Sequence, residues 1–137
     1  MEDEKGSFSR LKGRSERGKL AEDMALEYLL KKGLTLLQRN YRAGHREIDL
    51  IMKSGHFEHK NEMIHIVEVR SLSEPLVKLP FETVDRKKQR AVISAAARFI
   101  YRNNIHFDTR FDIVSVIFKE GGVVEVKYFP DAFAPEW

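Results

Sequence analysis

The sequence contains no cysteine, which excludes disulfide bonds and thiolate metal sites. It has no uninterrupted apolar run that approaches about 18 residues, and its first residues lack the apolar stretch of a signal peptide. Internal repeats and low-complexity tracts are absent as well. From these absences we expect a soluble protein that is neither exported nor bound to a membrane and that stays in the reducing cytoplasm.

The chain is long enough for one hydrophobic core, with 137 residues of which 42% are hydrophobic. Its formal net charge is only +3, so the total charge is compatible with a nucleic-acid partner but does not require one. The distribution is more informative, because the segment Arg86–Arg90 holds four cations and residues 10–19 form a second basic cluster. A solvated helix face and a flexible arm would account for these clusters equally well.

Composition and periodicity predict the first helix and what precedes it. Residues 1–14 are polar and aperiodic, so we expect a flexible basic arm ahead of one domain that spans residues 15–137. In this domain Ser15 is the expected N-cap of a helix and Gly33 its end. Glu22 points toward the edge of the apolar face, either to serve a function there or because an acid near the helix start favours the helix dipole.

A second helix is predicted over residues 83–104, with Thr83 or Asp85 as its cap. Most of its basic residues project away from the apolar side. Lys88 does not, because it stacks one turn before the apolar stripe. We expect Lys88 to reach back over the edge of the sheet, as an active-site lysine or as a lysine whose methylene chain covers apolar surface.

Five segments have the composition of β-strands and are separated by turns or by the second helix. The resulting order is α-β-β-β-α-β-β. This order predicts an α/β fold in which a mixed sheet of about five strands is flanked by helices, in two or three layers. The predicted strands are residues 34–42, 46–53, 63–71, 110–118 and 122–129.

Two carboxylates, Asp49 and Glu68, lie inside strands that are otherwise apolar. An unpaired ionised carboxylate in a buried strand is costly, so such residues usually have a use. Residues two apart on a strand share a face, so Glu68 and Arg70 project together, and Asp49 joins them if the two strands form a hairpin. Close carboxylates are stable mainly with a cation between them or with one protonated. An edge ion pair of Glu68 with Arg70 or Arg46 is the plainer alternative.

Hard divalent cations such as Mg²⁺ and Mn²⁺ take oxygen ligands, often one or two carboxylates, and leave positions open for chemistry on phosphates. Asp49 and Glu68 are therefore candidate metal ligands, and Glu22 is a candidate for a second metal or for orienting water. Arg70 or Lys88 would stabilise the charge that develops when a phosphodiester is attacked.

Three histidines, His56, His59 and His65, lie in or near the connection before the third strand. They could supply nitrogen ligands to a borderline metal. Their spacing is not that of a metal motif, and we interpret them as residues of an exposed loop.

Six motifs in order carry a family resemblance: GKLAEDMALEYL, QRNYR, REIDLI, VEVRS, ETVDRKKQ and RFDIV. From about Gly18 to Phe133 the chain resembles the bacterial YraN-like family. This uncharacterised group has a restriction-endonuclease-like fold akin to that of archaeal Holliday-junction resolvases.

The resemblance implies a nuclease core of the D…E-x-K type. Its two acids match Asp49 and Glu68, its helix-borne acid matches Glu22, and its basic position matches Arg70. Glu47 matches the glutamate of the family's G-E-I-D segment.

The chain departs from the family pattern at three positions, where Ala21 and Arg46 replace glycines and Arg70 replaces the usual lysine. Arginine stays protonated at physiological pH, so Arg70 cannot act as a general base, although it can hold a phosphate oxygen. Lys88, which matches the family's lysine in V-x-x-x-K-Q, is the candidate for a relocated active lysine.

The leading hypothesis is therefore a protein that binds DNA or another structured nucleic acid and cuts branched or damaged DNA with Mg²⁺ or Mn²⁺. The alternative is a non-catalytic nucleic-acid-binding module, or a scaffold for a repair or recombination enzyme. A homodimer is expected by analogy with related folds only. The residues expected to contact the phosphate backbone are Arg14, Arg17, Lys19, Arg86, Lys87 and Arg90.

Overall fold

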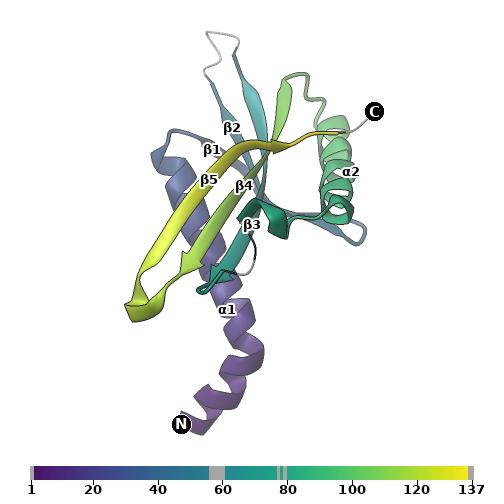
Figure 1. The fold of residues 1–137 in the computed structure, drawn as a ribbon. Coiled ribbons are helices and arrows are strands. Elements are labelled where there is room, and N and C mark those ends of the chain that lie inside the picture. Colours follow the sequence, from purple (N-terminus) through teal and green to yellow (C-terminus); the bar gives the residue numbers. More distant parts are fainter. Residues whose placement is uncertain (1, 56–60, 77, 79, 136–137) are drawn as a thin grey trace.

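The residues that the computed structural model describes are 2–55, 61–76, 78 and 80–135. Side chains are described from Glu16 onward, apart from Pro80 and Phe81. This part of the chain forms an α/β fold with a five-stranded mixed sheet, and its helices and strands follow the predicted order (Figure 1). The elements are α1 (Glu2–Lys31), β1 (Thr35–Ala43), β2 (Arg46–Ser54), β3 (Met63–Ser73), the 3-10 helix η2 (Pro80–Thr83), α2 (Arg86–Arg102), β4 (Asp108–Phe118), the 3-10 helix η3 (Glu120–Gly122) and β5 (Val124–Phe133).

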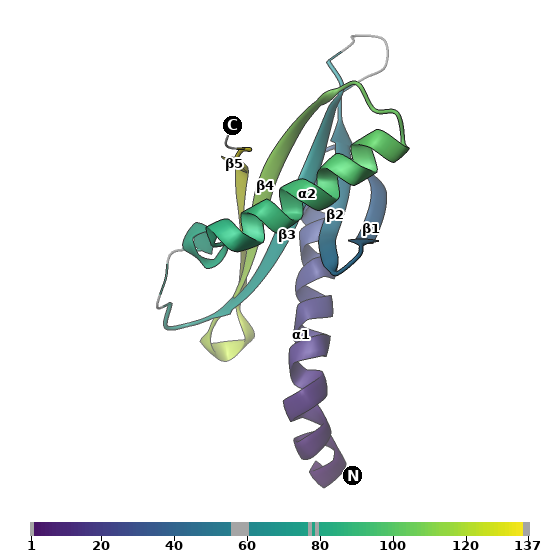
Figure 2. The same ribbon diagram turned by 90° about the vertical axis from the view of Figure 1, so that its right-hand side faces the viewer.

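Helix α1 begins at Glu2, so the predicted start at Ser15 was wrong. Residues 2–14 carry no apolar stripe to reveal a helix, but most of them are good helix formers that extend a helix already anchored by its later, packed turns. The first half of α1 projects beyond the sheet (Figures 1 and 2). The division of the chain into a flexible arm and a domain stays a prediction. Within the described ranges, neither α1 nor any other helix is long and apolar enough to cross a membrane.

The two helices cover opposite faces of the sheet, which gives three layers (Figure 2). The strands lie in the order β1-β2-β3-β4-β5, and all neighbours are antiparallel except the parallel pair β3 and β4. Alternation along the strands divides the core. Ile64 and Ile66 of β3 pack with Phe99 of α2, whereas Val67 packs with Leu29 of α1 on the other face.

The start of α2 is fixed by Asp85, whose side chain accepts a hydrogen bond of 2.8 Å from the backbone N–H of Lys88. This contact decides between the two caps that the sequence allowed. Val92, Ala95 and Phe99 then form the buried face of the helix. Because α2 begins at a fixed point, Lys88 in its first turn has a defined position above the sheet.

The sheet forks between β2 and β3. Their pairing ends at Leu50 opposite Val67, whereas β2 stays paired with β1 as far as Arg46, and β3 stays paired with β4 as far as Ser73. Figure 2 shows the β1–β2 hairpin diverging from β3. The first residue beyond the last pair is Asp49 on β2 and Glu68 on β3.

Candidate active site at the fork of the sheet

Asp49 and Glu68 contact each other at the fork. One step beyond the last antiparallel pair they face each other, and facing side chains in such pairs lie close together. Asp49 Oδ2 accepts a hydrogen bond of 2.8 Å from the backbone N–H of Val69, so the carboxylate takes the place of a strand partner. Glu68 is only 2% exposed and shares a hydrogen bond with Asp49. The structure thus brings together the two acids that the sequence singled out.

Burial raises the pKa of both carboxyl groups at the fork. Burial, and then the charge of Asp49, raises the pKa of Glu68 to about 8, although Lys88 and Arg70 act in the opposite direction. Burial also raises the pKa of Asp49, while the hydrogen bond from Val69 stabilises its charged form. At neutral pH the pair therefore carries less than two negative charges in the absence of a cation.

Both predicted basic residues lie beside Glu68. Lys88 Nζ is 3.5 Å from Glu68 Oε2, so the lysine does reach the sheet as expected. Arg70 Nε donates a hydrogen bond of 3.1 Å to Thr83 Oγ1, which fixes the guanidinium group at the end of η2. From there the positive charge of Arg70 lowers the pKa of Glu68. The acid pair is thus bordered by two cations from separate elements.

Glu22 approaches the fork from α1, on the other face of the sheet. Burial raises its pKa, and the negative charge of Asp49 raises it further, so the two acids are electrostatically linked. Arg39 Nε lies 3.2 Å from Glu22 Oε1 and partly neutralises it. With its side-chain nitrogen facing the acids, Asn40 donates to Glu22 Oε1 over 3.0 Å and to Glu47 Oε1 over 3.1 Å. The predicted acids therefore form two groups, Asp49 with Glu68 and Glu22 with Glu47, and the interaction of Glu22 with Asp49 links them.

A pocket of about 560 Å³ opens beside Glu22 and is lined by Lys19, Arg39 and Asn40 as well. Arg39 and Asn40 were not among the predicted site residues. Their motif, QRNYR, was noted only as part of the family resemblance, although Asn40 has a backbone φ of 54°, which is uncommon for a residue other than glycine. That strained backbone turns its side chain toward the acids.

The oxygen donors of Asp49 and Glu68 suit a hard divalent cation such as Mg²⁺ or Mn²⁺. Glu68 Oε1 is buried and, among the described residues, accepts no hydrogen bond from a donor group, so one lone-pair direction is left for another ligand. No three His, Asp or Glu side chains of the described residues converge as a ready-made metal cluster. The expected third ligand, Glu22, is held by Arg39, and its role in metal binding stays a prediction.

Among the described residues, His65 offers no metal site of this kind, and its interpretation as a residue of an exposed loop was wrong, because it lies in β3 and is buried. His65 has both ring nitrogens in hydrogen bonds, to Ser54 and to Asp112. His56 and His59 lie outside the described residues.

The predicted nucleic-acid contacts divide between the two faces of the sheet. Arg86, Lys87 and Arg90 are exposed at the start of α2, whereas Arg17 and Lys19 are exposed on α1. The side chain of Arg14 lies outside the described residues. A nucleic acid that contacts both sets has to pass around an edge of the sheet.

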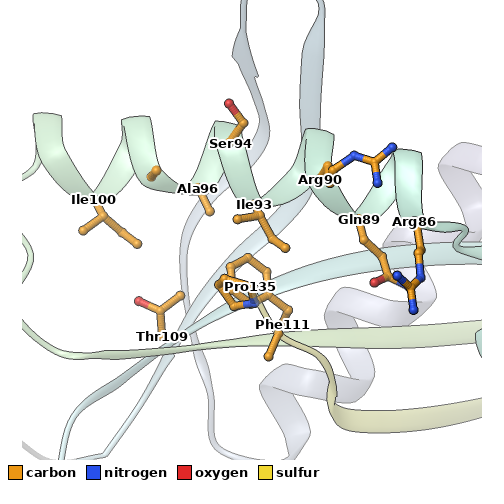
Figure 3. Close-up of a pocket in the computed structure, with 12 residues that line it drawn as sticks. Arg86, Gln89, Arg90, Ile93, Ser94, Ala96, Ile100, Thr109, Phe111 and Pro135 are labelled. Carbon is orange, nitrogen blue, oxygen red and sulfur yellow. The ribbon is translucent and has the colours of Figure 1, made fainter. Parts of the chain in front are cut away.

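A second pocket, of about 710 Å³, lies between α2 and the strand β4 (Figure 3). Its wall is mainly apolar, with Ile93 of α2 pointing toward Phe111 and Pro135, and Arg86 and Arg90 at one end. Its lining includes neither Asp49 nor Glu68, so it is separate from the acid pair.

Comparison with known proteins identifies relatives over most of the chain. The model of the uncharacterised protein family UPF0102 matches residues 21–116. A UPF0102 protein of Trichlorobacter lovleyi is 32% identical over 89% of this chain and 93% of its own length. One from Parabacteroides distasonis is 34% identical over 87% and 93%, and one from Chloroherpeton thalassium is 41% identical over 75% and 76%.

Proposed function

Because the chain belongs to the uncharacterised protein family UPF0102, whose name specifies no activity, we propose a function from the geometry. The protein binds DNA and hydrolyses its phosphodiester backbone with the help of Mg²⁺ or Mn²⁺. One observation carries this proposal. The buried carboxylate of Glu68 is held in contact with the partly buried carboxylate of Asp49, and burial together with their mutual repulsion raises the pKa of Glu68 to about 8.

The proposed fold relation supports this function. The resemblance to the YraN-like family implied a restriction-endonuclease-like fold with the acids on neighbouring strands. A mixed sheet in which β2 and β3 separate just where Asp49 and Glu68 lie is consistent with that arrangement. Family membership, which the resemblance predicted, is confirmed, whereas the relation to Holliday-junction resolvases is part of the proposal.

Each residue at the fork has a role in the proposed reaction. Asp49 and Glu68 would hold the cation, which when bound supplies a Lewis acid that withdraws charge from the phosphate. Lys88 and Arg70 both lie beside Glu68. They would bind the phosphate oxygens, whose negative charge increases when the phosphodiester is attacked. Arg70 stays protonated and therefore serves as an electrostatic group only. Glu22 borders the pocket on the α1 side and is proposed to orient water there.

The proposed substrate is branched or damaged DNA. The acid pair lies where the pairing of β2 and β3 ends, with Lys88 of α2 beside Glu68 and Glu22 of α1 electrostatically linked to Asp49. Basic residues are exposed on both helices, so a branched substrate could engage both faces while one backbone enters the fork.

The test is a cleavage assay on four-way junction, nicked and linear DNA with Mn²⁺ or Mg²⁺. We expect the wild-type protein to cut at least one branched or nicked substrate, and Asp49→Ala and Glu68→Ala to reduce cutting by at least about 100-fold. Glu125→Gln is the matched control, since this partly exposed acid of β5 pairs with Lys119 and Lys127 away from the fork. Cutting that survives both alanine variants would assign the activity to another site or to a contaminant.

A second candidate is a non-catalytic DNA-binding module. The observation in its favour is that Glu22 is paired with Arg39 and that the described residues contain no three-acid cluster. Binding without cutting, unchanged by either metal, would support this candidate. If the protein bound no nucleic acid at low salt, the remaining hypothesis would be that it is a scaffold for a repair or recombination enzyme.

A further inference from the structure

A second chain of polar contacts lies at the other end of β2, beyond the acid pair. Ser54 Oγ is 2.7 Å from His65 Nε2, and His65 Nδ1 is 2.7 Å from Asp112 Oδ2. These residues come from β2, β3 and β4 in turn. His65 alternates with Ile64 and Ile66, which pack beneath α2, so its ring lies on the α1 face of the sheet.

Hydrogen bonds from two further groups hold the carboxylate of Asp112 in place beside His65. This carboxylate is fully buried and accepts from Tyr128 OH over 2.6 Å and from the backbone N–H of Asp131 over 2.8 Å. Burial and Asp112 raise the pKa of Tyr128, so the phenol keeps its proton and donates it. In the neutral tautomer of His65 whose Nδ1–H donates to the carboxylate of Asp112, Nε2 accepts a hydrogen bond from the hydroxyl of Ser54.

The exposure of the three groups decreases in the order that a nucleophilic site needs. Ser54 is partly exposed, His65 is 8% exposed and Asp112 is fully buried. The backbone directly after Ser54 is tightly held, because a Cβ atom at Gly55 would lie 2.4 Å from the carbonyl oxygen of Asn61. Ser54 is therefore the most exposed of the three residues, while its partners are shielded from water.

We propose that Ser54 is a nucleophile that accepts an acyl group from a carboxylic ester, with His65 as general base and Asp112 as the positioning residue. Ser54 Oγ forms a bond to the carbonyl carbon as its proton moves to His65 Nε2. The bond from that carbon to the alcohol oxygen then breaks, and His65 returns the proton to the departing alcohol. Water then gives a proton to His65 Nε2 and attacks the acyl carbon, the bond from that carbon to Ser54 Oγ breaks, and Ser54 regains its proton as the carboxylic acid leaves, so no oxidant or reductant is needed.

This site is separate from the proposed DNA-cutting site. Ser54 and Asp49 are five positions apart on β2, which corresponds to about 16 Å. Glu68 contacts Lys88 of α2, whereas His65 lies on the α1 side of the sheet. An experiment can therefore contradict either proposal without contradicting the other.

The test uses an alkyl fluorophosphonate, which reacts with activated serines by forming an oxygen–phosphorus bond and releasing fluoride. Mass spectrometry of peptides identifies the labelled residue, and the label is expected on Ser54 and not in Ser54→Ala. Substituting the exposed Ser71 with alanine is the matched control and should leave labelling unchanged. His65→Asn should slow labelling by at least about 100-fold, which is the usual contribution of a general base.

Asp112→Asn should lower the maximal labelling rate without changing the probe concentration at half-maximal rate, a split that loss of a merely structural bond does not produce. If either variant does not fold, the wild-type protein is compared before and after unfolding in urea, and at least about a 100-fold loss of rate is expected on unfolding. Glu125→Gln, in which the changed acid pairs with Lys119 and Lys127, should label like the wild type. No label on Ser54, or equal rates in folded His65→Asn or in unfolded wild-type protein, would overturn the proposal.

Discussion

At the scale of single residues, the state of Glu68 depends on a balance between burial and charge. Lys88 Nζ lies 3.5 Å from its carboxylate, yet the pKa of Glu68 is raised rather than lowered. The cost of removing the charged form from water, together with repulsion by Asp49, thus exceeds the attraction of the lysine. A doubly charged cation would reverse this balance, whereas a single partly exposed ammonium group does not.

The raised pKa makes stability depend on pH in a defined direction. Between the usual glutamate pKa near 4.5 and the value of about 8 in the folded protein, the folded state binds the proton more tightly than the unfolded state. This stabilisation, on the order of 5 kcal/mol for a pKa difference of about 3.5, is complete below the lower value and is lost as pH rises through the higher one. Melting curves from about pH 5 to pH 9 should show this decline in the wild type and a flatter profile in Glu68→Gln. Glu125→Gln should follow the wild type, and equal slopes in all three would contradict the assignment.

Metal binding should act on the same two acids. Without Mg²⁺, neutralising Asp49 to Asn removes a buried repulsion and should raise the melting temperature at about pH 8. Added Mg²⁺ should raise the melting temperature of the wild type more than that of the variant, because only a protein that retains both carboxylates gains the full mass-action stabilisation. Scanning calorimetry at several Mg²⁺ concentrations measures both effects. A wild-type melting temperature that ignores Mg²⁺, with Asp49→Asn unchanged in either condition, would mean that the pair binds no cation.

The sequence was sufficient to find Asp49, Glu68 and Lys88 because each breaks a local rule. Two are charges in apolar strands, and the third is a cation on the apolar side of a helix. Arg39 and Asn40 break no such rule. They lie in a strand at the sheet edge, and their partners are defined only by how α1 packs across that strand, which sequence spacing does not specify.

At the scale of elements, the N-cap of α2 connects helix stability to the site. Asp85 accepts from the backbone N–H of Lys88, the residue whose side chain contacts Glu68. Asp85→Ala should lower the free energy of unfolding by about 1 kcal/mol and loosen the first turn, which weakens the contact between Lys88 and Glu68. Asp85→Asn is the matched control, since asparagine caps helices as well as aspartate does. Urea denaturation gives the energies, and an Asn variant as unstable as the Ala variant would show that charge rather than capping matters.

The sequence predicted only part of helix α1 and did not predict where β2 and β3 separate. The apolar positions of α1 from Ala21 onward predicted its packed half, since they repeat at helical spacing and are buried as expected. The earlier half has no such pattern, so its helical backbone could not be inferred. The fork was also unpredictable, because it depends on where pairing between β2 and β3 ends rather than on which residues form strands.

At the scale of the whole molecule, exposed basic residues lie on α1 and on α2, which cover opposite faces of the sheet. This distribution predicts how DNA binding depends on salt. For each phosphate interaction that a substitution removes, the slope of log affinity against log salt should fall by about 0.9. Replacing Arg86, Lys87 and Arg90 with alanine should therefore lower the slope by about 2 to 3 units. Replacing Arg17 and Lys19 should lower it by about 2 on a junction that reaches both faces and by little on a short linear duplex.

Fluorescence anisotropy at several salt concentrations measures these slopes for each DNA. Arg98→Ala with Arg102→Ala is the control, because both residues are exposed nearer the far end of α2. Equal reductions in slope for the α2 triple variant and this control would show that general charge, not the start of α2, attracts the DNA. If the α1 variant weakened linear and branched DNA alike, both substrates would contact the two faces, and the preference for branched DNA would lose its structural basis.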